Sequence, residues 1–90
     1  MSTPRKIKHP KVILRKLGRE KAYGYYDGRI YIDPGTRGRA RLEVMIHEYL
    51  HHLDPALPEE TVTSHAHKLA DFLHIHHVRI TEPEAQGLNE

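Results

Sequence analysis

The sequence contains no cysteine among its 90 residues. Disulfide bonds and thiolate metal sites are therefore excluded, and any bound metal must be held by histidine and carboxylate side chains. No apolar run approaches the roughly 20 residues that a membrane-spanning helix needs. The charged segment at residues 1–9 is not followed by an apolar stretch long enough for a signal peptide. We therefore expect a soluble cytoplasmic protein that does not associate with membranes.

A chain of 90 residues has room for one small domain, near the lower size limit for folding alone. No internal repeat is visible. We expect a basic flexible tail at residues 1–9, a folded core at residues 10–80 and a loose tail at residues 81–90. A bound metal would add stability to so small a core. The sequence leaves the oligomeric state open.

The net charge of +2 conceals a strong asymmetry along the chain. Residues 1–41 hold 12 Lys and Arg against 3 Asp and Glu, or +9, whereas residues 42–90 hold 2 against 9, or −7. The basic part could attract nucleic acid or an acidic protein surface. We favour the simpler interpretation, in which these basic residues lie on the solvated faces of strands.

Short apolar segments in the first part of the chain predict three β-strands, at residues 11–17, 21–26 and 29–33. The Asp-Gly pair at residues 27–28 predicts a two-residue hairpin turn in which both residues have positive φ. Gly24 indicates a bulge or a close backbone approach within its strand. Together the segments predict a small, mainly antiparallel three-stranded sheet.

Residues 39–53 have the apolar periodicity of an amphipathic helix. The helix is expected to end at Asp54, because a residue before proline avoids the helical region. A second helix is predicted at residues 58–73, and residues 75–80 are either a last strand or an extension of it. The buried face of this second helix is expected to consist of Val62, Ala66, Leu69 and Leu73. The predicted fold is α+β, with the sheet packed on the two helices.

The sequence HEYLH at residues 47–51 lies within the first predicted helix. His47 and His51 are four residues apart, so both imidazoles lie on one face of the helix and can take two corners of a tetrahedral Zn²⁺ site. Glu48 can then reach a zinc-bound water and act as its general base. The motif therefore predicts a zinc site with a catalytic carboxylate.

A catalytic zinc site needs a third protein ligand. The extended metzincin pattern is excluded, because Asp54 and Leu57 occupy the positions where it has Gly and His. The start of the second helix offers two glutamates. Helical phase places Glu59 about 50° from the centre of the apolar face and Glu60 about 150° away. We favour Glu59 over Glu60, with Asp54 and His65 as weaker alternatives.

The run at residues 42–51, the segment at residues 55–62 and the apolar positions after it resemble small zincin-type metallopeptidases of the gluzincin kind. The chain is similar to minimal HExxH proteins of bacteria and phages, and more distantly to the ImmA/IrrE-like peptidases. In the latter group the ligand glutamate is followed by small or apolar residues at plus three and plus seven, as Glu59 is by Val62 and Ala66. The resemblance covers about residues 22–73. It implies a sheet edge strand, an active-site helix and a glutamate-bearing helix.

These observations predict a zinc metallopeptidase in which His47, His51 and Glu59 hold Zn²⁺ and Glu48 is the general base. A peptide or protein substrate is expected to lie extended along the strand at residues 29–33 and to pair with it. The alternative is a non-catalytic, zinc-stabilised binding module whose basic part binds nucleic acid or an acidic protein; nucleic acid is not favoured.

Two further features of the sequence have simpler interpretations. His52, next to the motif, is expected to be exposed to solvent. The basic segment at residues 35–41 could touch phosphate, but it lacks the strand–loop–helix context and the lysine of a nucleotide-binding loop. We interpret it as a basic approach to the first helix.

Overall fold

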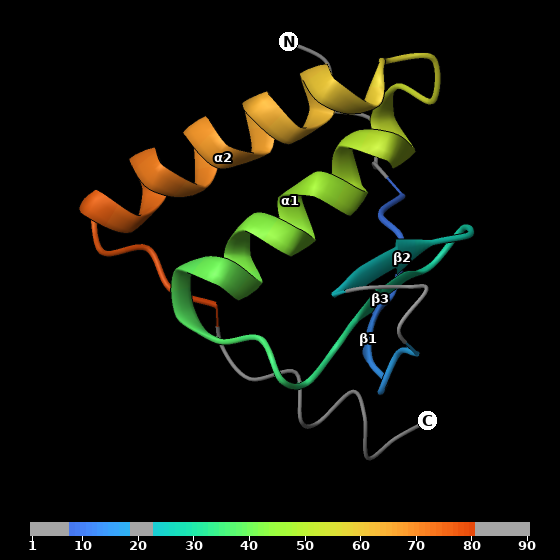
Figure 1. Cartoon of the computed structure of the whole chain (residues 1–90), viewed down its shortest axis with the longest axis horizontal. Coiled ribbons are helices and arrows are strands. Elements are labelled where there is room, and N and C mark those ends of the chain that lie inside the picture. The colour runs from blue at the N-terminus through green and yellow to red at the C-terminus, as the bar shows by residue number, and fades with distance from the viewer. Residues whose placement is uncertain (1–7, 19–22, 81–90) are drawn as a thin grey trace, which may run out of the picture.

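The computed structural model describes residues 8–18 and 23–80. A three-stranded sheet, helix α1 (Gly38–Leu53) and helix α2 (Glu59–Ile75) lie in that order, with α1 in the middle (Figure 1). The α+β class is confirmed. The sheet packs on α1 rather than on both helices, and α2 packs on the other side of α1. The expected tail at residues 81–90 and most of the tail at residues 1–9 lie outside the described residues.

The sheet is mixed, not mainly antiparallel as the sequence predicted. Its strands are β1 (Val12–Leu14), β2 (Gly24–Tyr26) and β3 (Ile30–Ile32), in the order β1-β3-β2. β1 is parallel to β3, and β2 is antiparallel to it. All three residues of β3 are buried. The most buried strand is therefore the central one, with both of its edges paired, and the order β1-β2-β3 of a simple meander is not adopted.

The hairpin loop between β2 and β3 has three residues rather than the expected two. The pairing of Tyr26 with Ile30 leaves residues 27–29 between the strands. The N–H of Asp27 donates to the carbonyl of Arg29 at 3.1 Å. Gly28 has a φ of 103°, whereas Asp27 has no positive φ. One glycine is thus enough to reverse the chain in this longer loop.

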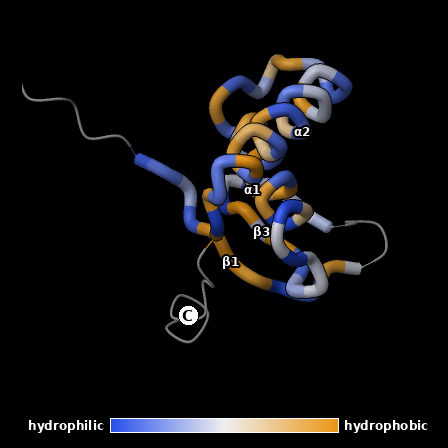
Figure 2. Tube along the Cα trace, turned by 90° about the vertical axis from the view of Figure 1, so that its left-hand side faces the viewer, coloured by the Kyte–Doolittle hydropathy of each residue, from blue (hydrophilic) through white to orange (hydrophobic). Residues whose placement is uncertain are grey.

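The two faces of the sheet have different surroundings. Gly24 is paired with Ile32, and a side chain at Gly24 would meet α1. Because side chains alternate along a strand, Ile30 and Ile32 face α1 as well. Tyr31 faces away, stacks on Tyr25 and lies under the guanidinium of Arg15, 4.4 Å from the ring centre. Figure 2 shows the hydrophobic stretches of β1 and β3 beneath α1.

Helix α1 begins one residue earlier than predicted and ends at Leu53 as predicted. Asp54 leaves the helical conformation ahead of Pro55, and its N–H still donates to the carbonyl of Leu50 at 2.9 Å. None of the helices in the described part of the chain is long and apolar enough to cross a membrane.

Helix α2 packs against α1 through small side chains. Its buried residues are Val62, Ala66 and Ala70. Leu69, expected in the buried face, is 44% exposed, because the contact follows the line of Val62, Ala66 and Ala70 at spacings of four. The alanines let the helices approach closely, and this narrow contact leaves Leu69 at its edge.

Helix α2 ends at Ile75, two residues beyond the predicted end, and residues 76–80 form no strand. The N–H of Val78 donates to the carbonyl of Leu73, and that of His77 to the carbonyl of His74, both at 2.9 Å. His77 has a φ of 65°. This pattern is a Schellman motif, in which the left-handed residue is usually glycine. It turns the chain from the end of α2 back toward the start of α1 (Figure 1).

Candidate metal site and its cleft

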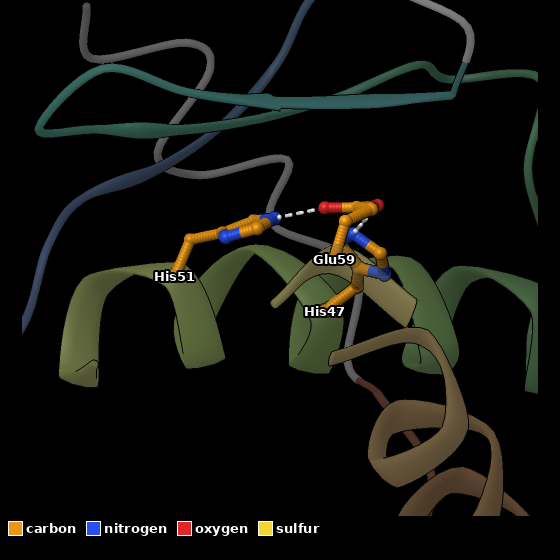
Figure 3. A group of neighbouring side chains, drawn as sticks. All are labelled: His47, His51 and Glu59. Carbon is orange, nitrogen blue, oxygen red and sulfur yellow. Dashed lines mark ion pairs between the residues drawn. The ribbon is translucent and has the colours of Figure 1, made fainter. Parts of the chain in front are cut away.

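Three side chains from two helices meet at one point (Figure 3). Nε2 of His47 lies 2.9 Å from one carboxylate oxygen of Glu59, and Nε2 of His51 lies 3.0 Å from the other. The two imidazole rings are 5.0 Å apart, as expected for residues one helical turn apart. Glu59 is the first residue of α2, so the short connection between the helices is what returns its carboxylate to α1.

The arrangement of these donor atoms fits a small metal ion. One ligand atom from each residue lies within 4.8 Å of the other two. Two ligand atoms at about 2.0–2.1 Å from Zn²⁺, at a tetrahedral angle, are roughly 3.3 Å apart. The two contacts between a histidine nitrogen and a Glu59 oxygen, 2.9 and 3.0 Å, are close to this value. Two imidazoles and one carboxylate are a ligand set of catalytic zinc sites, in which water takes the fourth position. In the part of the chain that the structure describes, no second group of three such residues has this spacing.

The other residues considered as the third ligand lie outside this group. Glu60 is exposed and does not belong to the cluster, in agreement with the preference for Glu59. Asp54 and His65 are also exposed and are not part of the cluster. The structure thus brings together His47, His51 and Glu59. Whether they bind a metal stays a prediction.

Glu48 lies in the same cleft but does not belong to the three-residue cluster. Its side chain is half-buried, and this burial raises its pKa above the ordinary value for a glutamate. Positive charge on His47 and His51 would lower the pKa, whereas the carboxylate of Glu59 raises it further. A carboxyl group with a raised pKa next to a candidate metal site is a better proton acceptor than a fully solvated one.

A cavity of about 460 Å³ connects the cluster with strand β2. Its lining includes Tyr23 and Gly24 from the strand side, Glu48 and His47 from α1, and Glu59 from α2. β2 is an edge strand, because among the described residues it pairs only with β3. The cavity is therefore bordered by a strand with one unpaired edge.

Gly24 lets β2 approach α1 closely at this point. A Cβ at Gly24 would lie 2.5 Å from Cγ1 of Val44 and 3.0 Å from a carboxylate oxygen of Glu48. The pairing of β2 with β3 is regular at all three positions, so the strand has no bulge there. Of the two roles that the sequence suggested for Gly24, the close approach is confirmed. The glycine keeps the strand against the helix turn that carries Glu48.

The strand expected to receive a peptide is the wrong one. Residues 30–32 form β3, which is paired on both sides and has no free edge. The sequence pattern identified a buried strand but not its place in the sheet. The strand that lines the cavity is β2, through Gly24.

A polar network continues from the cluster along the two helices. Arg39 donates to Glu43 at 2.8 Å and lies 3.6 Å from Asp71 of α2. His67 of α2 contacts both Arg39 and Glu43. Sequence reasoning missed this network, although Arg39, Glu43, His47 and His51 recur every fourth residue and so share one face of α1. The seam between the helices is polar along this face.

His52 is half-buried, not exposed as expected. Its Nδ1 lies 2.8 Å from the hydroxyl of Tyr26 in β2. Tyr49 makes a similar contact, 2.9 Å, with Nδ1 of His9 ahead of β1. Both partners lie far away in the sequence, so no local pattern predicts these contacts. They fix the helix turn that carries the motif against the sheet.

No known protein family, no characterised protein and no solved structure matches the chain. The resemblance to gluzincins accordingly rests on the residues of this sequence alone, and it stays a prediction.

Proposed function

We propose that the protein is a zinc-dependent peptidase that hydrolyses peptide bonds. The observation that carries the proposal is the approach of Glu59 to both motif histidines, at 2.9 and 3.0 Å, with Glu48 in the same cleft. His47, His51 and Glu59 would hold Zn²⁺, and Glu48 would be the general base. A bound Zn²⁺ would polarise the scissile carbonyl and acidify the attacking water.

Glu48 would take a proton from the attacking water and deliver it to the leaving amine. Its partial burial favours this role, since the raised pKa makes the protonated form easier to reach after the first step. The side chain of Glu48 lies close to Gly24 of β2, and this contact limits the directions in which the carboxylate can move. In this proposal Glu48 acts on the attacking water and is not itself a metal ligand.

The substrate in this proposal is an extended peptide that adds to the edge of β2 opposite β3, where no other strand pairs among the described residues. Backbone hydrogen bonds to an edge strand hold a peptide in a fixed register, whatever its sequence. Gly24 and Tyr23 border the cavity that also contains Glu48 and Glu59. A peptide on this edge would therefore pass across the cluster. The cytoplasmic location expected from the sequence belongs to the same proposal, and cell fractionation would test it.

The test compares the wild-type protein with Glu48→Gln. Both are purified without chelator, analysed for zinc by mass spectrometry and incubated with a mixture of unstructured peptides. We expect about one zinc per chain in both proteins and hydrolysis about 10²–10⁴ times slower in the variant. Glu60→Gln is the matched control, because it removes the neighbouring exposed carboxylate, and it should keep full activity.

Two results would contradict the proposal. If the purified protein contains no zinc and takes none up, Glu59 only accepts hydrogen bonds from the two imidazoles and the metal site does not exist. Zinc without any cleavage, together with salt-dependent binding of nucleic acid or an acidic protein, would favour the non-catalytic binding module instead.

A further inference from the structure

A second cavity, of about 590 Å³, lies between the start of α1 and the end of α2. It is separate from the metal cluster: none of His47, His51 or Glu59 lines it. A rise of about 1.5 Å per residue places the lining residues on α1, from Leu42 back to Gly38, roughly 8–14 Å along the helix from His47. Its volume lies within the usual range for small-molecule sites, about 300–1,000 Å³.

The polar lining of this cavity is entirely basic. It includes Arg37 and Arg39 at the start of α1, Arg41 one turn on, and Arg79 beyond the end of α2. Two histidines, His74 and His77, complete it. Among the described residues, no aspartate or glutamate lines the cavity.

The four arginines differ in what holds them. Arg39 is paired with Glu43 and Asp71. Arg41 is 4% exposed and donates to the hydroxyl of Thr36 and the carbonyl of Pro34, which fixes the loop before α1. Arg37 and Arg79 are exposed residues at the cavity. Because both side chains are exposed, their guanidinium groups can turn toward a ligand without leaving a buried position.

The start of α1 adds to the positive potential. No side chain caps this helix end, and its first turn has no acidic residue. The first backbone N–H groups of a helix lack partners within the helix and carry partial positive charge. The arginines thus surround a helix end that itself favours an anion.

The rest of the lining is aliphatic. Ile75 and Val78 line the cavity and are among the exposed large hydrophobic residues, at 61% and 44% exposure. Leu42 and Ile80 lie on the same wall. A ligand that covered these side chains would remove apolar surface from water, a gain that an inorganic anion alone could not provide.

We infer that this cavity binds a small phosphomonoester with an apolar or aromatic body, of which a nucleoside monophosphate is an example. Arg37, Arg79 and the first N–H groups of α1 hold the phosphate, and the aliphatic wall takes the body of the ligand. Planar guanidinium groups suit phosphate because each can donate two parallel hydrogen bonds. This inference does not depend on the proposed peptidase activity.

The test is a titration of the full chain, labelled with ¹⁵N, with AMP, inorganic phosphate and adenosine at constant ionic strength. We expect AMP to bind more tightly than either of the other two. The amide signals that shift should belong to Gly38, Arg39 and residues 77–79. Shifts centred on His47 and His51 would place the anion at the metal cluster and would overturn the inference.

The double variant Arg37→Gln/Arg79→Gln removes two exposed charges and should weaken AMP binding by about tenfold for each arginine. The matched control, Lys8→Gln/Arg29→Gln, removes two exposed charges elsewhere and should bind AMP as the wild type does. Equal losses in both double variants would show that only net charge matters and would contradict a site. Equal affinities for AMP and phosphate would contradict the role of the aliphatic wall.

Discussion

Helix α1 borders two openings of opposite electrostatic character. In its C-terminal half, His47 and His51 meet the carboxylate of Glu59. At its N-terminal end, the cavity lining contains arginines and histidines and, among the described residues, no acid. Helix α1 therefore carries one site suited to a cation and a second site suited to an anion.

The difference depends on what each end of α2 supplies. The start of α2 brings Glu59 to the histidines, whereas the segment after its end brings His77 and Arg79 to the arginines. Arg39 lines both cavities and is tied to Glu43 and Asp71. Arg39 and its ion pairs therefore lie at the boundary between the two cavities.

The comparison is tested most strongly at Glu59. Glu59→Gln should weaken zinc binding by at least roughly 100-fold, because even residues that only support a metal ligand typically contribute 10–100-fold. Competition with a chromophoric chelator measures this affinity. Glu60→Gln should leave it unchanged, and a similar loss in both variants would mean that the assigned third ligand is wrong.

A methyl group at Gly24 should disturb the wall of the metal cleft. In Gly24→Ala the new Cβ would meet Val44, so β2 or α1 must shift, at a cost of about 1–3 kcal/mol in the free energy of unfolding. Urea denaturation measures the change. Gly18→Ala is the control, because nothing lies within 4 Å of its added Cβ. Its stability should stay within about 1 kcal/mol of the wild type.

At the arginine end, His77→Gly should stabilise the protein. His77 has the left-handed conformation, which costs an L-residue about 1–2 kcal/mol. Glycine relieves this strain, but its greater conformational freedom in the unfolded chain cancels part of the gain. The expected gain is about 0.5–1 kcal/mol, measured by thermal unfolding. His76→Gly has no such strain to relieve and should lower the stability; a loss in both variants would show that His77 makes contacts worth more than its strain.

The smallest effect is expected at Asp33, in the loop that leads to α1. Its pKa is lowered by hydrogen bonds from the N–H groups of Gly35 and Leu17 and by the charge of Lys16. Because the pKa is lower in the folded state, this stabilisation is present above the pKa of the unfolded chain, about 4, and is lost as the pH falls toward the folded value. Asp33→Asn should therefore flatten the acid side of the melting-temperature profile below about pH 4. An unchanged profile would contradict it.

The helices could be predicted closely because their signals are local. The apolar period and Pro55 define α1, and Pro58 followed by two glutamates defines the start of α2. Helical phase also separated Glu59 from Glu60. The geometry of the candidate site was thus accessible from the sequence, since all its residues lie on two adjacent helices.

Features that depend on distant partners could not be predicted. β3 is central because it pairs with β1, which lies far away in the sequence. No local pattern predicts this pairing, and the prediction that a peptide pairs with residues 29–33 is wrong for that reason. The helical period predicts Leu69 in the core, but it does not show how narrow the contact through Ala66 and Ala70 is, and Leu69 lies outside this contact. The second cavity unites residues 37–42 with residues 74–80, and no local pattern connects them.

The position of the three candidate ligands within residues 47–59 has a consequence for folding. A metal at this point would cross-link only the helical hairpin, a short loop whose closure costs little chain entropy. The sheet, by contrast, forms through contacts between remote segments, which are slower to establish. Chelation should therefore increase hydrogen exchange first at the start of α2, while the amides of α1 that face β2 and β3 keep their protection.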